Sequence, residues 1–306
     1  MQGAAVTFSQ LRSFVAVADT GSVRAAAALL IVTPSAVSSA VTALQDEVGT
    51  PLMVREGRGL RLTEAGEVYA DYARRILGLL DEAQVAAAGE LDPAHGELRL
   101  AAVTTAGEQI VPRLLAGFTE HYPGVGLRLE VGNRDDVRAR LDAHEADLAI
   151  GGRPGAGAGA RPGADGLHVY AVRRNELVVV IPADAEPGKD ARGWLAAQTW
   201  LLRERGSGTR ATTVAFLERL GLQPRTQTLG SNVAIVGAVA AGLGVTLVSR
   251  DAVEQLLSDR QVAVQPLAGT PLRRDWHLVG REAGLPATAR LFSRFVIDCG
   301  EFSRPR

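Results

Sequence analysis

The chain has 306 residues, of which 46% are hydrophobic and 22% are charged. This length allows two or three compact units, and the composition is that of an ordinary soluble globular protein. The formal net charge of −1 excludes binding to nucleic acid through bulk charge alone, and the lack of an apolar run of roughly 20 residues excludes a membrane-spanning helix.

The N-terminal part of the chain is predicted to form three short helices separated by tight breaks. Apolar residues repeat at helical spacing in the first helix, which Gly21 ends, and Ser22 caps the second. Thr33 and Pro34 have the residue types of a helix cap and first turn, so they begin the third helix, which runs to Gly49. A short helix followed by a tight turn and another helix is the helix-turn-helix arrangement.

The third helix has one apolar face and one hydroxylated face. Val37, Val41 and Leu44 follow helical spacing and are expected to be buried. The opposite face is either a solvated surface or, given the helix-turn-helix arrangement, a surface for DNA. We expect its small polar residues to face the major groove: Thr33, Ser35, Ser38, Ser39 and Thr42.

Two short strands about a glycine-rich turn follow in the segment LMVREGRGLRLT. Three arginines cluster in this hairpin, at positions 55, 58 and 61. A basic hairpin beside a recognition helix can bind phosphates or enter a minor groove. We therefore expect Arg55 and Arg58 to contact the DNA backbone or the minor groove.

A long helix begins at Thr63, which has the residue type of a helix cap. Its apolar residues repeat with alternating spacings of four and three, as in a coiled coil: Ala65, Tyr69, Tyr72, Ile76, Leu79, Ala83 and Ala86. Packing against the chain's own domain and packing against a second copy both explain this seam. We expect Tyr69, Tyr72, Ile76 and Leu79 to pair two chains. The segment LDPAHG then breaks the helix.

Beyond Gly96 the pattern changes to alternating strands and helices, which is typical of a parallel sheet with helices on both faces. A second such set follows a Gly/Ala/Pro-rich break at residues 154–166, and the last strand and helix return to the first set. We therefore predict two α/β lobes, joined near residues 167–173 and again near residues 265–274. A cleft between such lobes is the natural ligand site.

The loop RERGSGTR, residues 203–210, is the strongest candidate for that ligand site. Its Gly-Ser-Gly turn presents backbone N–H groups at the start of a helix, where the helix dipole favours an anion. The alternative is that Ser207 or Thr209 merely caps the helix while the arginines pair with Glu204.

We expect an anion site, built from this loop and from polar strand ends on both lobes. The predicted residues are Thr104, Thr105, Asn133, Arg203, Gly206, Ser207, Gly208, Thr209, Arg210, Ser231 and Asn232.

Several motifs are excluded. Residues 155–160 match the glycine spacing of a dinucleotide-binding fingerprint, but no helical pattern follows them. We therefore do not expect them to bind a dinucleotide. The five histidines have no metal-ligand spacing, so neither a metal nor a cofactor is expected. There is no nucleophile-elbow motif, and Cys299, the single cysteine, is more typical of packing than of redox chemistry.

The chain resembles a LysR-type transcriptional regulator over essentially its whole length. The similarity is carried by the spacing of residues between positions 11 and 66: Leu11, Phe14, Gly21, Ser22, Ala26, Ala27, Ala36, Ser38, Leu44, Gly49, Pro51, Leu52, Arg55, Leu62, Thr63, Ala65 and Gly66. It implies an α/β protein in three parts. These are a winged helix-turn-helix (7–64), a linker and dimerisation helix (65–95), and a two-lobed effector domain like a periplasmic binding protein (96–301). Lobe I would comprise about 96–166 and 268–301, and lobe II about 167–267.

The resemblance also implies partners. They are double-stranded DNA, a small anionic metabolite as effector, further copies of the chain in a homotetramer made of two dimers, and RNA polymerase. The loop at 203–210 resembles that of the carbon- and sulfur-assimilation regulators. Relatives often carry Gln, Arg and Gln where this chain has Pro34, Ser39 and Ala40, so its DNA site sequence is not recoverable.

Two other functions fit parts of the chain. A solute-binding protein shares the two-lobed body, but the N-terminus lacks an export signal and carries the helix-turn-helix instead. An enzyme with a DNA-binding arm would need a catalytic constellation, and no such pattern is present. The single cysteine and the lack of an export signal indicate the cytoplasm.

Overall fold

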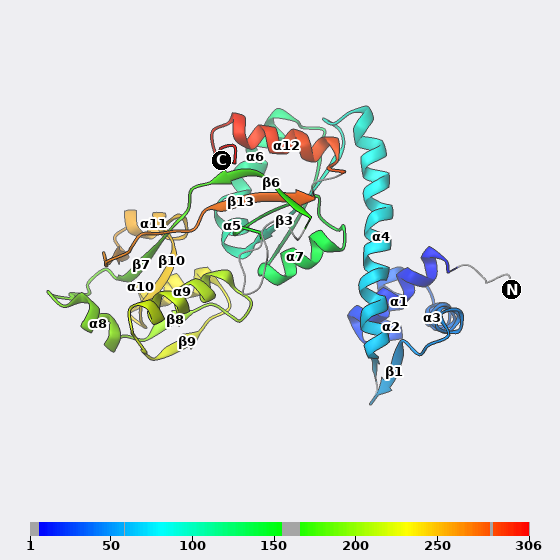
Figure 1. Cartoon of the computed structure of the whole chain (residues 1–306), viewed down its shortest axis with the longest axis horizontal. Helices are drawn as coiled ribbons and strands as arrows, with labels where there is room; N and C mark the ends of the chain where they lie inside the picture. Colours follow the sequence, from blue (N-terminus) through cyan, green and yellow to red (C-terminus); the bar gives the residue numbers. More distant parts are fainter. Residues whose placement is uncertain (1–5, 58, 155–165, 282–283, 306) are drawn as a thin grey trace. The chain divides into compact units, whose positions relative to one another are not determined.

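The structure, a computed structural model, describes residues 6–57, 59–154, 166–281 and 284–305 (Figure 1). The chain divides into two compact units. The first comprises Met1–Val85 with Asp142–Glu145, and the second comprises Ala86–Leu141 with Ala146–Arg306.

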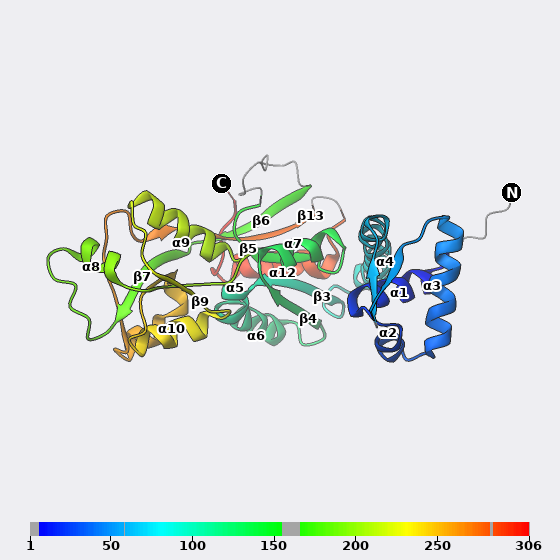
Figure 2. The same ribbon diagram turned by 90° about the horizontal axis from the view of Figure 1, so that it is seen from below.

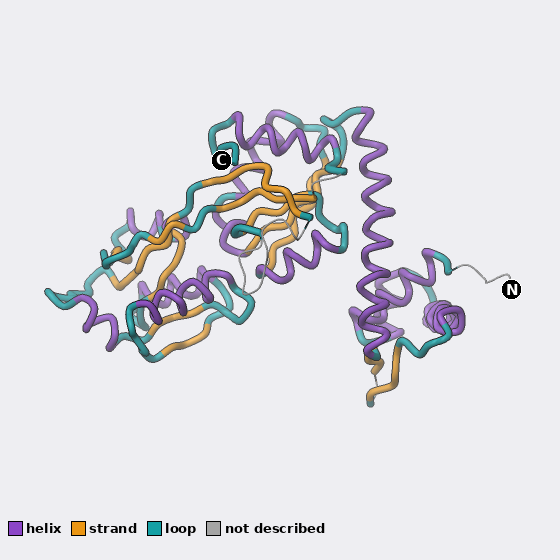
Figure 3. Tube along the Cα trace, in the orientation of Figure 1, coloured by secondary structure: helices purple, strands orange, loops and turns teal. Residues whose placement is uncertain are grey.

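The first unit contains the predicted helices and hairpin (Figure 3). Its elements are α1 (Phe8–Thr20), α2 (Val23–Leu30), α3 (Pro34–Val48), β1 (Met53–Glu56), β2 (Gly59–Leu62) and the start of α4 (Glu64–Leu91). The caps lie where the residue types predict them, since the side chains of Ser22 and Thr33 accept hydrogen bonds from the backbone of α2 and α3. Gly21 ends α1 in the left-handed conformation, at φ 65°.

The core of the first unit joins α1, α3 and α4. Phe14 and Leu44 are fully buried, and the ring of Tyr69 on α4 meets that of Phe14 edge-on at 5.6 Å. Ala70 and Ala73 bring α4 close to this core because their side chains are small. Two views show α3 on the outer side of the unit, with α1 between it and α4 (Figures 1 and 2). The polar residues of α3 that face away from the core are exposed.

The second unit contains a five-stranded sheet of order β4-β3-β5-β13-β6. Its strands are β3 (Glu97–Val103), β4 (Gly126–Gly132), β5 (Leu148–Gly151), β6 (Leu167–Arg173) and β13 (Trp276–Arg281). Its helices are α5 (Thr104–Gln109), α6 (Val111–His121), α7 (Arg134–Asp142) and α12 (Ala287–Asp298). The apolar residues of α6 and α12 pack on one face of the sheet and those of α7 on the other. This sheet and its helices form lobe I.

A second sheet in the same unit is built around β7 (Glu176–Pro182). Its other strands are β10 (Thr246–Ser249), β11 (Val262–Val264) and β12 (Leu272–Arg273), and a separate pair is formed by β8 (Trp200–Leu202) and β9 (Thr226–Thr228). The helices are α8 (Ala191–Ala197), α9 (Gly208–Arg219), α10 (Asn232–Ala240), η1 (Arg250–Ala252) and α11 (Glu254–Ser258). These elements form lobe II.

Three expectations from the sequence need correction. Parallel pairing holds for β3, β4 and β5 and for β8 with β9, but β7 is antiparallel to all three of its partners and β13 is antiparallel to β5 and β6. Buried apolar runs look alike in both kinds of sheet, so the pattern could not separate them. In addition, residues 167–173 form β6 of the first sheet, not the start of lobe II as predicted. Finally, Cys299 is exposed where packing was expected, because it follows the last turn of α12.

The two lobes are joined by two chain segments that lie side by side at Asn175 and Arg274. The amide N–H of Arg274 donates to the Asn175 carbonyl at 2.9 Å, and Asn175 Nδ2 donates to the Arg274 carbonyl at 2.9 Å. The Oδ1 atom of Asn175 accepts from Ser249 Oγ at 2.6 Å, at the end of β10. Asn175 is almost fully buried, so these bonds hold the crossing point together away from water.

No single helix in the described part of the chain is long and apolar enough to cross a membrane. The helices α2 and α3 reach that length and composition only when taken together, and they meet at 108°.

Candidate functional site

The loop between β8 and α9 contains the helix start that the sequence indicated. Ser207 is the N-cap of α9, and its hydroxyl accepts from the Arg210 amide at 3.5 Å. Gly206 precedes it at φ 84°, a conformation that favours glycine. Thr209 lies in the first turn. The capping role in the alternative interpretation therefore belongs to Ser207, and the first amides of α9 remain available to a ligand.

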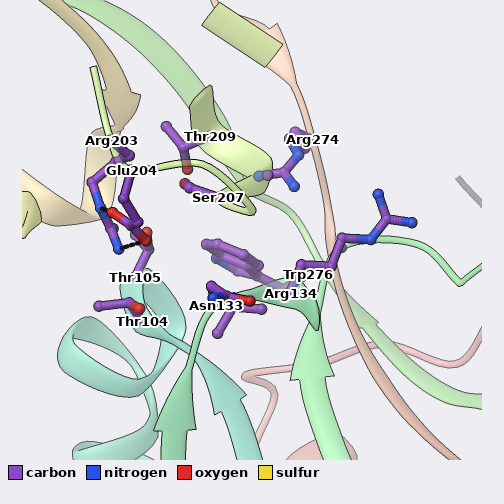
Figure 4. Close-up of a pocket in the computed structure, with 13 residues that line it drawn as sticks. Thr104, Thr105, Asn133, Arg134, Arg203, Glu204, Ser207, Thr209, Arg274 and Trp276 are labelled. Carbon is purple, nitrogen blue, oxygen red and sulfur yellow. Dashed lines mark hydrogen bonds and ion pairs between the residues drawn. The ribbon is translucent and has the colours of Figure 1, made fainter. Parts of the chain in front are cut away.

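A small cavity, here called the central cavity, lies in front of this helix start (Figure 4). Its volume is about 20 Å³, roughly the space of a single water molecule. Residues from both lobes and from the crossing segments line it: Val103, Thr104, Thr105, Asn133, Arg134, Gly152, Arg203, Glu204, Ser207, Gly208, Thr209, Arg274 and Trp276.

Seven of the predicted site residues line this cavity, and four do not. Gly206 and Arg210 line a neighbouring opening of about 490 Å³ instead. Ser231 caps α10 by accepting from the Ala234 amide at 3.4 Å. Asn232 is buried and its Nδ2 donates to Oγ1 of the lining residue Thr105 at 2.8 Å, so it joins the two lobes.

Two of the loop arginines are bonded within the protein. Arg203 is almost fully buried, and its guanidinium forms two hydrogen bonds to the Glu204 carboxylate, at 2.7 and 2.9 Å (Figure 4). Arg210 donates from Nη1 to the Arg203 carbonyl at 2.8 Å and to Thr228 Oγ1 at 3.1 Å. Arg210 therefore supports the loop, whereas Arg203 lies at the cavity wall.

Arg274, which lies on the second crossing segment, was not among the predicted site residues. Its guanidinium fits between two glycines, one on each lobe. A Cβ at Gly152 would lie 3.1 Å from Nη2 of Arg274, and a Cβ at Gly208 would overlap the same atom. Burial, and then the nearby charge of Arg134, lower the pKa of Arg274 from its ordinary value. Within the described residues this guanidinium has neither a hydrogen bond nor an ion pair.

Trp276 was also missed. It is 1% exposed and lines the central cavity, and its indole Nε1 is buried without a hydrogen-bond partner among the described residues. Leaving a buried N–H without an acceptor costs about 1–3 kcal/mol. The segment RRDWH, with two arginines close to a tryptophan near a predicted crossing, was the one weak signal in the sequence. Its place beside the cavity depends on the fold.

The charges around the cavity favour an anion. Arg274 and the positive end of the α9 dipole meet there, and Glu204 is the only carboxylate in the described lining, to which Arg134 also belongs with its guanidinium turned away from the cavity (Figure 4). A guanidinium at a helix N-terminus repels the helix dipole, so an acceptor group between them relieves an unfavourable arrangement.

A larger groove of about 630 Å³, here called the side groove, shares Arg134, Gly152, Gly208 and Arg274 with the central cavity. Its Asp275 pairs with Arg273, whose hydrogen bond lowers the pKa of that carboxyl group. His277 also lines the groove, and burial lowers the pKa of its imidazole from the ordinary value of 6.5.

The residues predicted to contact DNA lie on open surface. Thr33, Ser35, Ser38, Ser39 and Thr42 are all exposed, and Thr33 also caps α3 by accepting from the Ala36 amide at 3.3 Å. Arg55 is exposed on β1, and Arg58 lies outside the described residues. Arg61 pairs with Glu56 across the hairpin at 3.3 Å.

The predicted dimerisation residues divide into two groups. Tyr69 packs against Phe14 inside its own unit, and burial raises the pKa of its hydroxyl. Tyr72, Ile76 and Leu79 are 59%, 44% and 48% exposed. Val68, which was not predicted, is 60% exposed on the same helix. In the described part of the chain, no group of three or more His, Cys, Asp or Glu side chains is arranged to hold a metal ion.

Comparisons with known proteins match this architecture. Residues 8–67 match the family described as "Bacterial regulatory helix-turn-helix protein, lysR family", and residues 92–299 match the family described as "LysR substrate binding domain". The chain is 35% identical over 298 residues to a RuBisCO operon transcriptional regulator of Allochromatium vinosum, covering 96% of each chain. It is 36% identical over 281 residues to the regulator CfxR of Cupriavidus necator, covering 90% of this chain and 85% of CfxR.

Solved structures show the same fold. A full-length OxyR variant of Pseudomonas aeruginosa matches with a TM-score of 0.69 at 21% identity, covering 99% of each chain. The regulatory domain of CcmR from Synechocystis PCC6803, solved in complex with 2-PG, matches with a TM-score of 0.59 at 27% identity, covering 66% of this chain and 96% of that domain. With a helix-turn-helix match at one end and an effector-domain match over most of the remainder, the chain belongs to the LysR family of DNA-binding transcriptional regulators.

Proposed function

We propose that this regulator is switched by a small metabolite whose carboxylate or phosphate group binds in the central cavity. The observation that carries the proposal is Arg274, a largely buried cation held between Gly152 and Gly208 at the start of α9. An anion there accepts hydrogen bonds from the guanidinium, from the first amides of α9 and from the indole N–H of Trp276.

Movement of the lobes follows from the size of the cavity. The volume of about 20 Å³ is roughly that of one water molecule, so we infer that a metabolite enters an opened form. The anion then bridges groups of both lobes and of the crossing segments, and it stabilises a closed form with a different separation of the lobes.

Three further parts of the proposal concern DNA, assembly and target genes. The exposed hydroxyl face of α3 reads the major groove, while Arg55 and Arg58 contact the backbone or minor groove. The exposed residues Tyr72, Ile76 and Leu79 pair two α4 helices, and two such dimers form the tetramer.

The relatives named as RuBisCO operon regulators support carbon-assimilation genes as targets, and the 2-PG complex of CcmR supports an anionic effector. Contact with RNA polymerase, action in the cytoplasm and the three-part division at residues 7–64, 65–95 and 96–301 complete the proposal, with β6 assigned to lobe I and β12 to lobe II.

The test compares two neighbouring arginines. Arg274→Gln removes the cavity cation, and Arg273→Gln removes an exposed arginine that pairs with Asp275 outside the central cavity. Thermal melts and calorimetric titrations use inorganic phosphate and small carboxylates on the full chain. We expect anions to stabilise the wild type and Arg273→Gln but not Arg274→Gln. Equal responses of the two variants would place the anion elsewhere, and no response of the wild type would remove the anionic effector from the proposal.

A further inference from the structure

The pair formed by Arg203 and Glu204 has the geometry that a ligand carboxylate would adopt. Two nitrogens of the Arg203 guanidinium bind the two oxygens of one carboxylate, at 2.7 and 2.9 Å. This side-by-side arrangement is the preferred way in which arginine binds both carboxylates and phosphates. In the present structure, the anion on Arg203 is supplied by the next residue in the chain.

The two partners differ in their access to water and in their freedom. The Arg203 side chain is 4% exposed, whereas that of Glu204 is 33% exposed. Both line the central cavity, with Glu204 on the cavity side of the pair (Figure 4). The Arg203 guanidinium is therefore fixed in the cavity wall. The Glu204 carboxylate can rotate towards water, and its charge then stays solvated.

We propose that Glu204 is an internal competitor for the effector: its carboxylate occupies Arg203 in the effector-free form, and the anionic group of the effector displaces it. This inference rests on the proposed function, because it concerns the same cavity. It assigns Arg203 a second state, in which the guanidinium joins Arg274 in binding the effector anion.

The charge balance explains why such a competitor matters. With Glu204 in place, its carboxylate offsets the charge of Arg203, and Arg274 is the other lining arginine whose guanidinium lies towards the cavity (Figure 4). Displacing that carboxylate exposes the whole charge of Arg203 to the ligand, which favours a dianionic group such as a phosphate monoester over a single carboxylate. Competition by Glu204 therefore raises the effector concentration that is needed for binding. It also makes the site selective for phosphorylated effectors.

The test removes the competing charge with Glu204→Gln, and inorganic phosphate and acetate serve as the probes. We expect the Kd for phosphate to fall roughly tenfold and the Kd for acetate to fall less. In phosphate-free buffer the variant should melt at a lower temperature than the wild type, and phosphate should raise its melting temperature by more. The matched control is Glu176→Gln, which removes a carboxylate from another arginine pair of lobe II, with Arg174, outside the cavity; its phosphate affinity should stay within twofold of the wild type.

A second variant tests whether the effect passes through Arg203. Arg203→Lys keeps the charge but loses the two-nitrogen face, so adding Glu204→Gln to it should improve phosphate binding by less than threefold. An unchanged or weaker affinity of Glu204→Gln overturns the competitor, as does a full tenfold gain in the Arg203→Lys background. The Arg274→Gln titration separates the two proposals. If that variant loses phosphate binding while Glu204→Gln gains nothing, only the competitor is wrong; if it binds normally, the effector site itself is wrong.

Discussion

Gly208 is the position at which one added methyl group tests the effector site most directly. It is the first residue of α9, and its backbone does not have the positive φ that would require glycine. A Cβ at Gly208 would lie within 3.0 Å of Nη2 of Arg274, closer than such carbons approach other atoms. Because Nη2 ends a flexible side chain, we expect Gly208→Ala to push the guanidinium aside and to leave the helix intact.

The size of the effect follows from the bond that is lost. A hydrogen bond to a charged group contributes about 1.5–3 kcal/mol, and a displacement of about 1 Å removes most of it. The Kd for an anion should therefore rise about 10- to 150-fold in Gly208→Ala. Alanine in place of glycine lowers the entropy of the unfolded chain, which stabilises a compatible site by about 0.4–1 kcal/mol. The melting temperature without ligand should thus stay level or rise slightly.

Gly152→Ala provides a graded comparison at the same guanidinium. Its Cβ would lie 3.1 Å from Nη2, so the arginine needs to yield by only a few tenths of an ångström and the loss of affinity should be severalfold at most. The assay is calorimetric titration of the three full-length proteins with inorganic phosphate, accompanied by thermal melts. Wild-type affinity in Gly208→Ala would show that Arg274 does not bind the anion. A collapse of the melting temperature would show that the backbone, not Arg274, absorbs the overlap.

The remaining predictions concern the other surfaces. Arg55→Ala should weaken binding to specific and nonspecific DNA alike and lower the salt dependence by about one phosphate contact, as measured by gel shift at several salt concentrations; an unchanged slope refutes the wing assignment. Ile76→Glu combined with Leu79→Glu should give smaller species in sedimentation, and an unchanged mass would assign these side chains to another role. For His277, the lowered folded-state pKa means that the unfolded chain binds more protons below about pH 6.5, so stability should fall as pH falls through this range. The melting temperature of His277→Gln should depend less on pH than that of the wild type, and an equal pH dependence would contradict this assignment.

The parts of the fold that depend on neighbouring residues were predictable from the sequence. The caps at Ser22 and Thr33 and the end of α1 at Gly21 need only local backbone geometry, and the structure has them where the residue types indicated. The start of α9 was predictable for the same reason, although the cap is Ser207 and Thr209 follows it.

The side chains that meet only in the folded chain were not predictable. The return of the last strand to lobe I was predicted, but no local pattern distinguishes Arg274 and Trp276 from other residues of this crossing, so their place in the cavity lining was not. Asn232 was predicted as a ligand contact from its place at a polar strand end, and the structure shows its Nδ2 donating to Thr105 Oγ1 of the other lobe. Pairing partners of buried polar side chains depend on the fold, which the periodicity of one sequence does not contain.

The bonds at Asn175 restrict how the lobes can move. Two adjacent chain segments joined along their sides resist rotation of one lobe about the long axis of the connection, but they allow bending across it. The bond to Ser249 extends this bracing into β10 of lobe II. We therefore expect the two lobes to move mainly by bending at this connection. The lobes then lose few relative orientations when a ligand closes the domain. A small loss of conformational entropy leaves more of the ligand's binding free energy to shift the balance between open and closed populations.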